Sequence, residues 1–209
     1  MTAVLHAEWI KLRSLRSTYL TLAAAVVLGA GLGFLDTSSV AHHWATMSAA
    51  DRAAFDPVGD SFTGLVFAQL AFGVLGVLTI SSEYGTGMIR TTLTAVPRRG
   101  RLLAAKALVV GAVALVAGEL FAFGTFLLGQ VMLASAHLDV ALTSPGVLRA
   151  VSSAGLYLGV VALVGCGAGA LLRHTAGGVA VMFGVIHAAS SNGHPRGGAA
   201  NLSSWDHLL

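Results

Sequence analysis

The sequence predicts an all-α membrane protein, a polytopic helical bundle with four full spans, a short fifth, and an N-terminal interfacial helix. Hydrophobic residues make up 56% of the chain and charged residues only 10%, whereas an ordinary soluble domain carries about 25% charged residues. The mean hydropathy is +0.81. Four apolar runs each reach the roughly 18 to 20 residues that a spanning helix needs: 17–35, 61–82, 107–138 and 150–172.

The first 16 residues predict a helix that lies in the membrane interface. Leu5, Trp9 and Leu12 are spaced i, i+4, i+7 and therefore share one face. The charged residues fall mostly on other faces: Glu8, Lys11, Arg13 and Arg16. A solvated N-terminus is the plain alternative. A cleavable signal peptide ending near residues 39–41 is another, although the apolar run is longer than a usual signal-peptide core.

The first span, 18–35, ends in small residues at 29–33 that allow another helix backbone to approach closely. The second span, 62–80, places Gln69, Gly73, Gly76 and Ile80 on one stripe. An amide in hydrocarbon needs a hydrogen-bond partner. This face is therefore predicted to meet protein, with the lining of a path through the membrane as the alternative.

The loop between these spans, residues 36–60, is expected on the outside. It carries four aspartates against one arginine: Asp36, Asp51, Asp56 and Asp60 against Arg52. The neighbouring His42 and His43 have no spaced carboxylate or cysteine partner, so the sequence predicts no metal site.

The third span contains a carboxylate. Glu119 lies in the same helical stripe as Phe123, Phe126 and Gln130. An ionised carboxylate inside a membrane costs a few kcal/mol, so it is protonated, partnered or facing water. Contact with a proton or substrate and local packing against Gln130 are both open interpretations.

The fourth span has the most regular stripe of small residues in the chain. These recur at alternating steps of four and three: Gly155, Gly159, Ala162, Cys166 and Gly169. Such steps keep one flank of the helix toward one neighbour, and glycine allows close backbone approach. The stripe predicts a helix interface, of which contact between two copies is one use.

The chain beyond the fourth span differs in character. Residues 176–189 form a fifth apolar run of about 14 residues, shorter than a standard span. Residues 190–209 have no periodicity and are predicted to be a disordered or aberrant tail. The sequence thus divides into a membrane domain, 1–189, and this tail.

The polar loop after the second span, 82–101, joins one acidic residue to several cations around a Gly-Thr-Gly turn. Its middle, 88–96, can form a short amphipathic helix that suits docking on another protein. Nine of the twelve lysines and arginines lie at the N-terminus, in or just after this loop, and after the fourth span: Lys11, Arg13, Arg16, Arg90, Arg98, Arg99, Arg101, Lys106 and Arg173. The positive-inside rule therefore predicts a cytosolic N-terminus and a cytosolic loop.

Three stretches carry a family resemblance: Glu8-Trp9-Ile10-Lys11-Leu12-Arg13; Glu83-Tyr84-x-Thr86-Gly87-Met88-Ile89-Arg90 with Leu93 and Pro97-Arg98-Arg99; and Leu171-Leu172-Arg173-x-Thr175-Ala176. Over residues 1–186 the chain resembles ABC-2 type transporter permeases, and the second stretch is similar to their first cytosolic loop. In that family the loop contacts an ATPase subunit. The resemblance implies this coupling role for Glu83, Tyr84, Thr86, Gly87, Arg90, Pro97, Arg98 and Arg99. Such permeases usually carry six spans, so a truncated or frameshifted product is expected.

The resemblance implies the membrane-spanning subunit of an ATP-driven exporter in the cell membrane. Its expected partners are an ABC ATPase, a second permease chain forming a homodimer or heterodimer, and the lipid bilayer. The chain has no phosphate-binding G-x-x-x-x-G-K-[ST] loop, so ATP hydrolysis is expected on a separate chain. We expect no enzymatic activity, no cofactor and no nucleic acid partner. The alternative is a membrane protein that moves nothing, either a permease remnant or an immunity or scaffold protein.

Overall fold

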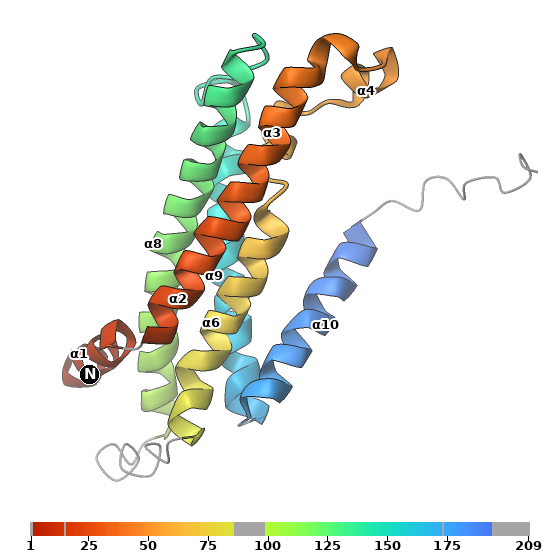
Figure 1. Ribbon diagram of the computed structural model, residues 1–209. Coiled ribbons are helices and arrows are strands. Elements are labelled where there is room, and N and C mark those ends of the chain that lie inside the picture. The colour runs from red at the N-terminus through yellow and green to blue at the C-terminus, as the bar shows by residue number, and fades with distance from the viewer. Residues whose placement is uncertain (1, 15, 86–98, 173, 194–209) are drawn as a thin grey trace, which may run out of the picture.

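The computed structural model describes residues 2–14, 16–85, 99–172 and 174–193, and nearly all of these are helical (Figure 1). The order along the chain is α1 (Thr2–Ser14), α2 (Arg16–Ala24), the π-helix η1 (Ala25–Ala30), α3 (Gly31–His43), η2 (Trp44–Thr46), α4 (Ala49–Ala54), α5 (Pro57–Asp60), α6 (Leu65–Gly85), α8 (Arg99–Ala134), α9 (Val147–Leu172) and α10 (Thr175–Gly193).

Four of these helical stretches are long and apolar enough to cross a membrane: Arg16–Thr46, Leu65–Gly85, Leu102–Ala134 and Val147–Leu172. A shorter apolar helix covers Thr175–Ala188. The predicted class, a helical bundle with four full spans and a short fifth, is therefore confirmed.

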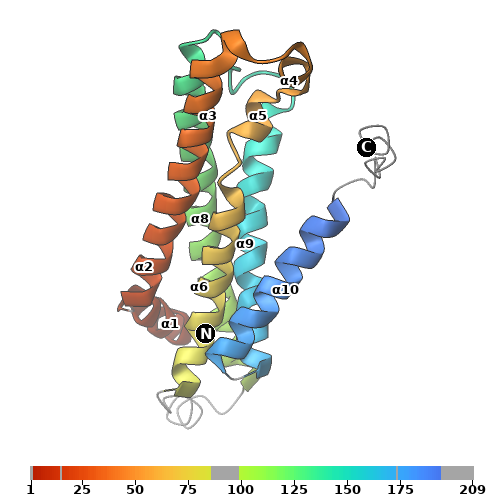
Figure 2. The ribbon, with the colours of Figure 1, turned by 45° about the vertical axis from the view of Figure 1, so that its right-hand side comes forward.

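The long helices run side by side, and α1 lies across one end of the bundle (Figures 1 and 2). The helix α9 packs against both α6 and α8, while α3 packs on α8. The helix α10 touches α6 and α9 near the end where α1 lies and leans away from the bundle toward its own C-terminal end (Figure 2).

Glycines set the close approach of α9 to its two neighbours. A Cβ added to Gly76 would lie 1.9 Å from the carbonyl oxygen of Ala162, and one added to Gly155 would lie 2.8 Å from the Cα of Glu119. Gly159 faces Leu115 of α8, and Gly169 faces Val77 and Ile80 of α6. The small-residue stripe of the fourth span is thus occupied by helices of the same chain.

Two helices extend beyond their predicted ends. The first span continues past Leu35 to Thr46, because no glycine or proline after Gly33 interrupts the helix there. The helix α8 begins at Arg99, well before the predicted start after Lys106. Apart from Gly100, the residues of this stretch are arginine, leucine, alanine and lysine, which are all good helix formers.

Gln130 organises the end of the bundle opposite α1. Its Nε2 donates to Ser61 Oγ at 3.2 Å and to the Pro57 carbonyl at 3.3 Å, and its Oε1 accepts from the backbone N–H of Val140 at 2.7 Å. These bonds connect α8 to the two connecting segments on that side. The partners of Gln130 are therefore loop groups rather than Glu119.

Candidate functional site

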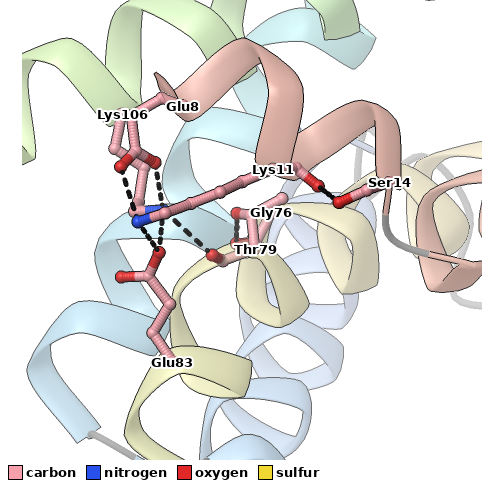
Figure 3. A network of polar contacts seen from close by, with 7 residues as sticks. All are labelled: Glu8, Lys11, Ser14, Gly76, Thr79, Glu83 and Lys106. Carbon is pink, nitrogen blue, oxygen red and sulfur yellow. Dashed lines mark hydrogen bonds and ion pairs between the residues drawn. The ribbon is translucent and has the colours of Figure 1, made fainter. Parts of the chain in front are cut away.

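Four charged side chains meet where α1 crosses the bundle (Figure 3). Glu8 and Lys11 come from α1, Glu83 from the last turn of α6, and Lys106 from α8. Their formal charges cancel. Lys106 Nζ lies 2.6 Å from Glu8 Oε2 and 3.0 Å from Glu83 Oε1, and Lys11 Nζ lies 3.1 Å from both Glu8 Oε1 and Glu83 Oε1. We call these four residues the charge network.

Lys106 is the centre of the network. It is 5% exposed, and besides the two carboxylates it donates to the Thr79 carbonyl at 3.3 Å. An ammonium group has three donors, and here each has an acceptor. A buried lysine is tolerated when it is paired and hydrogen-bonded in this way.

The carboxylates join the three helices. Glu8, 3% exposed, uses one oxygen for each lysine, while Oε1 of Glu83, 4% exposed, accepts from both. Within the described residues, Oε2 of Glu83 has no hydrogen-bond partner. Burial lowers the pKa of Lys11, but its hydrogen bonds to Glu83 and Glu8 outweigh burial and raise that pKa above the ordinary value. Lys11 therefore stays charged at neutral pH.

An apolar cluster supports the network. Leu12 of α1, Val110 of α8 and Cys166 of α9 are buried together, with Val113 packed against them. A cavity of about 100 Å³ adjoins, lined by the four charged residues and by Ser14, Ser82 and Thr79 among others. The helix α1 is thus attached to the bundle by both ion pairs and apolar packing.

The face of α1 that packs differs from the predicted apolar face. Leu12 is buried as expected, but Trp9 is 46% exposed and Glu8 is buried. Lys11 turns to the network, whereas Arg13 is exposed. A charged face packs inward because Lys106 and Glu83 supply its partners.

The predicted coupling loop follows the network directly. The helix α6 ends at Gly85, two residues after Glu83, and α8 resumes at Arg99, seven residues before Lys106. Tyr84 is half-buried at the end of α6. The other predicted coupling residues lie outside the described side chains: Thr86, Gly87, Arg90, Pro97, Arg98 and Arg99. The amphipathic helix predicted at 88–96 also lies outside the described residues.

Lys106 is the member of the network that sequence reasoning missed, because it was counted as a loop cation. A signal was present. It is the lysine that interrupts an otherwise apolar stretch from 102 to 118, and it precedes Val110 by four residues, so both share a helix face. A charge on the packed face of a long helix requires a buried partner.

The predicted membrane-path residues are placed separately from this network. Gln69 is buried and its Oε1 accepts a hydrogen bond from the Tyr157 hydroxyl of α9. Glu119 is half-buried on α8, with its side chain against the backbone of Gly155. Gln130, as described above, belongs to the opposite end of the bundle. The structure does not bring these three polar side chains together.

The four helical stretches that are long and apolar enough to cross a membrane are typical of a multi-pass helical membrane protein. Residues 4–186 match the family described as ABC-2 family transporter protein, and the chain belongs to this family. Its members are membrane permeases that are typically not catalytic themselves, and membership implies an ATPase partner. Neither the curated proteins nor the solved structures yielded a match.

Proposed function

We propose that the chain is the membrane-spanning subunit of an ATP-driven exporter and that the charge network transmits the movement of a separate ATPase chain. The observation that carries this is the position of the network. It ties α1 to α6 two residues before α6 ends, and to α8 seven residues after α8 begins, so it lies close to both ends of segment 86–98. A displacement of that segment would move three helices together.

The physical basis is the stiffness of a buried ionic cluster. Pulling Glu8 away from Lys106 leaves uncompensated charges out of water, which costs several kcal/mol. The cluster therefore favours rigid movement of α1 with the ends of α6 and α8 over separation. Hinge and rigid-body motions of packed helices are the usual way in which such displacements spread.

Two copies, or this chain and a related one, would enclose the substrate path. In the proposal Glu119 contacts the substrate or a proton on that path, since a half-buried carboxylate inside a membrane-spanning helix marks such pathways. The change Glu119→Gln tests this part. Export that responds to pH in the unchanged chain and loses that response in the variant is expected, and an unchanged response would leave Glu119 a packing residue.

The coupling proposal is tested with the ATPase subunit co-expressed with the chain. Glu83→Gln and Arg90→Ala are each purified by a tag on the permease, and bound ATPase and its hydrolysis rate are measured. Arg90→Ala is expected to weaken association. Glu83→Gln is expected to leave association largely intact and to lower stimulation of ATP hydrolysis, because its side chain is buried in the network.

The matched control is Arg149→Ala, which removes an exposed cation of α9 far along the chain from the loop. Normal association and normal stimulation in both Glu83→Gln and Arg90→Ala would disprove the coupling role. No ATPase co-purifying even with the unchanged chain would favour a membrane protein that moves nothing.

A further inference from the structure

Two adjoining apolar cavities form a groove on the outside of the bundle. One, of about 290 Å³, lies between α8 and the α2–η1 segment, with Phe72 of α6 also in its lining. The other, of about 310 Å³, lies between α8 and Trp9 of α1. Both are lined by Ala117 and Leu120, so they lie next to each other along α8. We call the joined space the α8 groove.

The groove exists because small side chains face each other across it. Ala25 and Ala30 line one wall, and Ala117 and Gly124 line the other. A Cβ placed on Gly124 would meet nothing within 4 Å. The η1 wall packs closely on the opposite side, where a Cβ on Gly64, the residue just before α6, would lie 1.7 Å from the Gly29 carbonyl oxygen.

The groove opens laterally, on the outer surface of the helical bundle. Val116 is 61% exposed and Leu120 is 71% exposed on its rim. In a chain of spanning helices this exposed apolar surface faces lipid tails. The lining runs along α8 from Ala112 to Leu128, which is about 24 Å of helix. That exceeds the about 15 Å of one half of the hydrocarbon core.

The end of the groove at Trp9 has the character of a headgroup site. Tryptophan is enriched where lipid tails meet headgroups. Arg13 follows Trp9 by four residues on α1, hence on the same helix face, and its side chain is exposed. A cation there complements an anionic headgroup, while the groove beyond it carries almost no polar surface.

We propose that the α8 groove binds one acyl chain of an anionic phospholipid, with the headgroup beside Arg13. A second copy of the chain is the other possible occupant, and the exposed cation Arg13 at the end of the groove favours the anionic lipid. The proposal rests on the placement of α1 in the membrane interface, which the sequence predicts. It requires no ATPase, so its failure would be distinguishable from failure of coupling.

The test uses the full chain in nanodiscs of phosphatidylcholine containing a phosphatidylglycerol probe with a photoreactive diazirine in one acyl chain. After irradiation, peptide mass spectrometry maps the adducts. Adducts concentrated on residues 112–128 and 22–30 are expected. Adducts spread evenly over the exposed faces of α8, α9 and α10 would mean ordinary boundary lipid and would overturn the proposal.

A filling variant and a matched control sharpen the result. Gly124→Phe places a ring in the groove, whereas Gly167→Phe places one on α9, where a Cβ also meets nothing within 4 Å. Labelling of residues 112–128 is expected to fall about tenfold, equivalent to 1.4 kcal/mol, in the first and to stay unchanged in the second. The thermal midpoint of each variant checks that it is folded. If Gly124→Phe does not fold, the adduct map of the unchanged chain alone tests the proposal.

The headgroup part is tested with Arg13→Gln, which should remove the preference for the phosphatidylglycerol probe over a phosphatidylcholine probe of the same chain. An unchanged preference would overturn it. If a second copy of the chain covered the α8 groove, Leu120→Cys would form disulfide-linked dimers. Efficient formation of such dimers in nanodiscs would also overturn the proposal.

Discussion

Lys106 of α8 donates to Glu8 of α1 at 2.6 Å, and both side chains are buried. This pair joins residues 98 positions apart and fixes the transverse helix to the bundle. Since Lys106 also bonds Glu83 and the Thr79 carbonyl, one ammonium group holds three helices together.

Removing that ammonium group should destabilise the protein strongly. Lys106→Met keeps the length of the side chain but leaves Glu8 and Glu83 with Lys11 as their shared cation, and breaking a buried pair from one side costs about 3–5 kcal/mol. We expect a lowered thermal midpoint in detergent. The exposed cation Arg149 provides the control, and Arg149→Met should change stability by less than about 0.5 kcal/mol.

A double-mutant cycle with Glu8→Gln measures the pair itself. Because the two residues are in contact, the combined variant should lose less stability than the two single variants added together. Additive losses would show that Glu8 and Lys106 act independently, contrary to the network.

The contact between α6 and α9 should be similarly sensitive at Gly76. A methyl group there would approach the Ala162 carbonyl oxygen to 1.9 Å, so the two backbones must separate. Gly76→Ala is expected to cost about 3 kcal/mol, the upper part of the usual overpacking range. Gly167→Ala, on the open side of α9, should change stability by less than about 1 kcal/mol. Equal midpoints for the two variants in thermal unfolding would contradict the described packing.

Asp60 should give a pH-dependent effect at the opposite end of the bundle. Burial raises the pKa of Asp60, a backbone hydrogen bond at Asp56 lowers it, and the carboxylates of Asp36 and Asp56 raise it further, for a net increase above 3.8. A raised pKa in the folded state means a stability contribution that is full below pH 3.8 and is lost as pH rises through the folded value.

At pH 7 the ionised Asp60 is therefore unfavourable, and Asp60→Asn should raise the free energy of unfolding slightly, by about 0.5 kcal/mol or less, which thermal unfolding measures. The gain should shrink as the pH falls toward 3.8. Asp139→Asn removes an exposed carboxylate and serves as the control. A gain that is constant across pH would show that the charge of Asp60 is not its cause.

The spans were predictable because hydropathy over about twenty residues reports burial in lipid without any knowledge of neighbours. The glycine stripe of α9 likewise predicted a packed face. It could not say which helix occupies that face, and the structure places α8 beside Gly155 and α6 beside Gly169. A one-dimensional pattern gives the face of a helix but not the partner.

The charge network was less accessible to sequence reasoning. The family resemblance singles out Glu8 and Glu83, but the sequence pattern places Lys106 only among the cytosolic cations near the loop. The buried pairs join residues that are 23 to 98 positions apart. Periodicity within one helix carries no information on such contacts, which arise only when α1 folds back across α6 and α8.

The side of the membrane on which the network lies can be tested by cysteine labelling. Thr94 lies in the basic segment after α6, and the excess of lysine and arginine around it predicts the cytosol. Thr94→Cys should therefore resist an impermeant maleimide in intact cells and react once the membrane is opened.

Ala53→Cys, on the exposed helix α4 at the opposite end of the bundle, should react in intact cells. The native Cys166 is 2% exposed, so it gives little background. Labelling of Thr94→Cys from outside would place the network at the external surface, where no cytosolic ATPase could act on it, and the coupling proposal would then fail together with the predicted orientation.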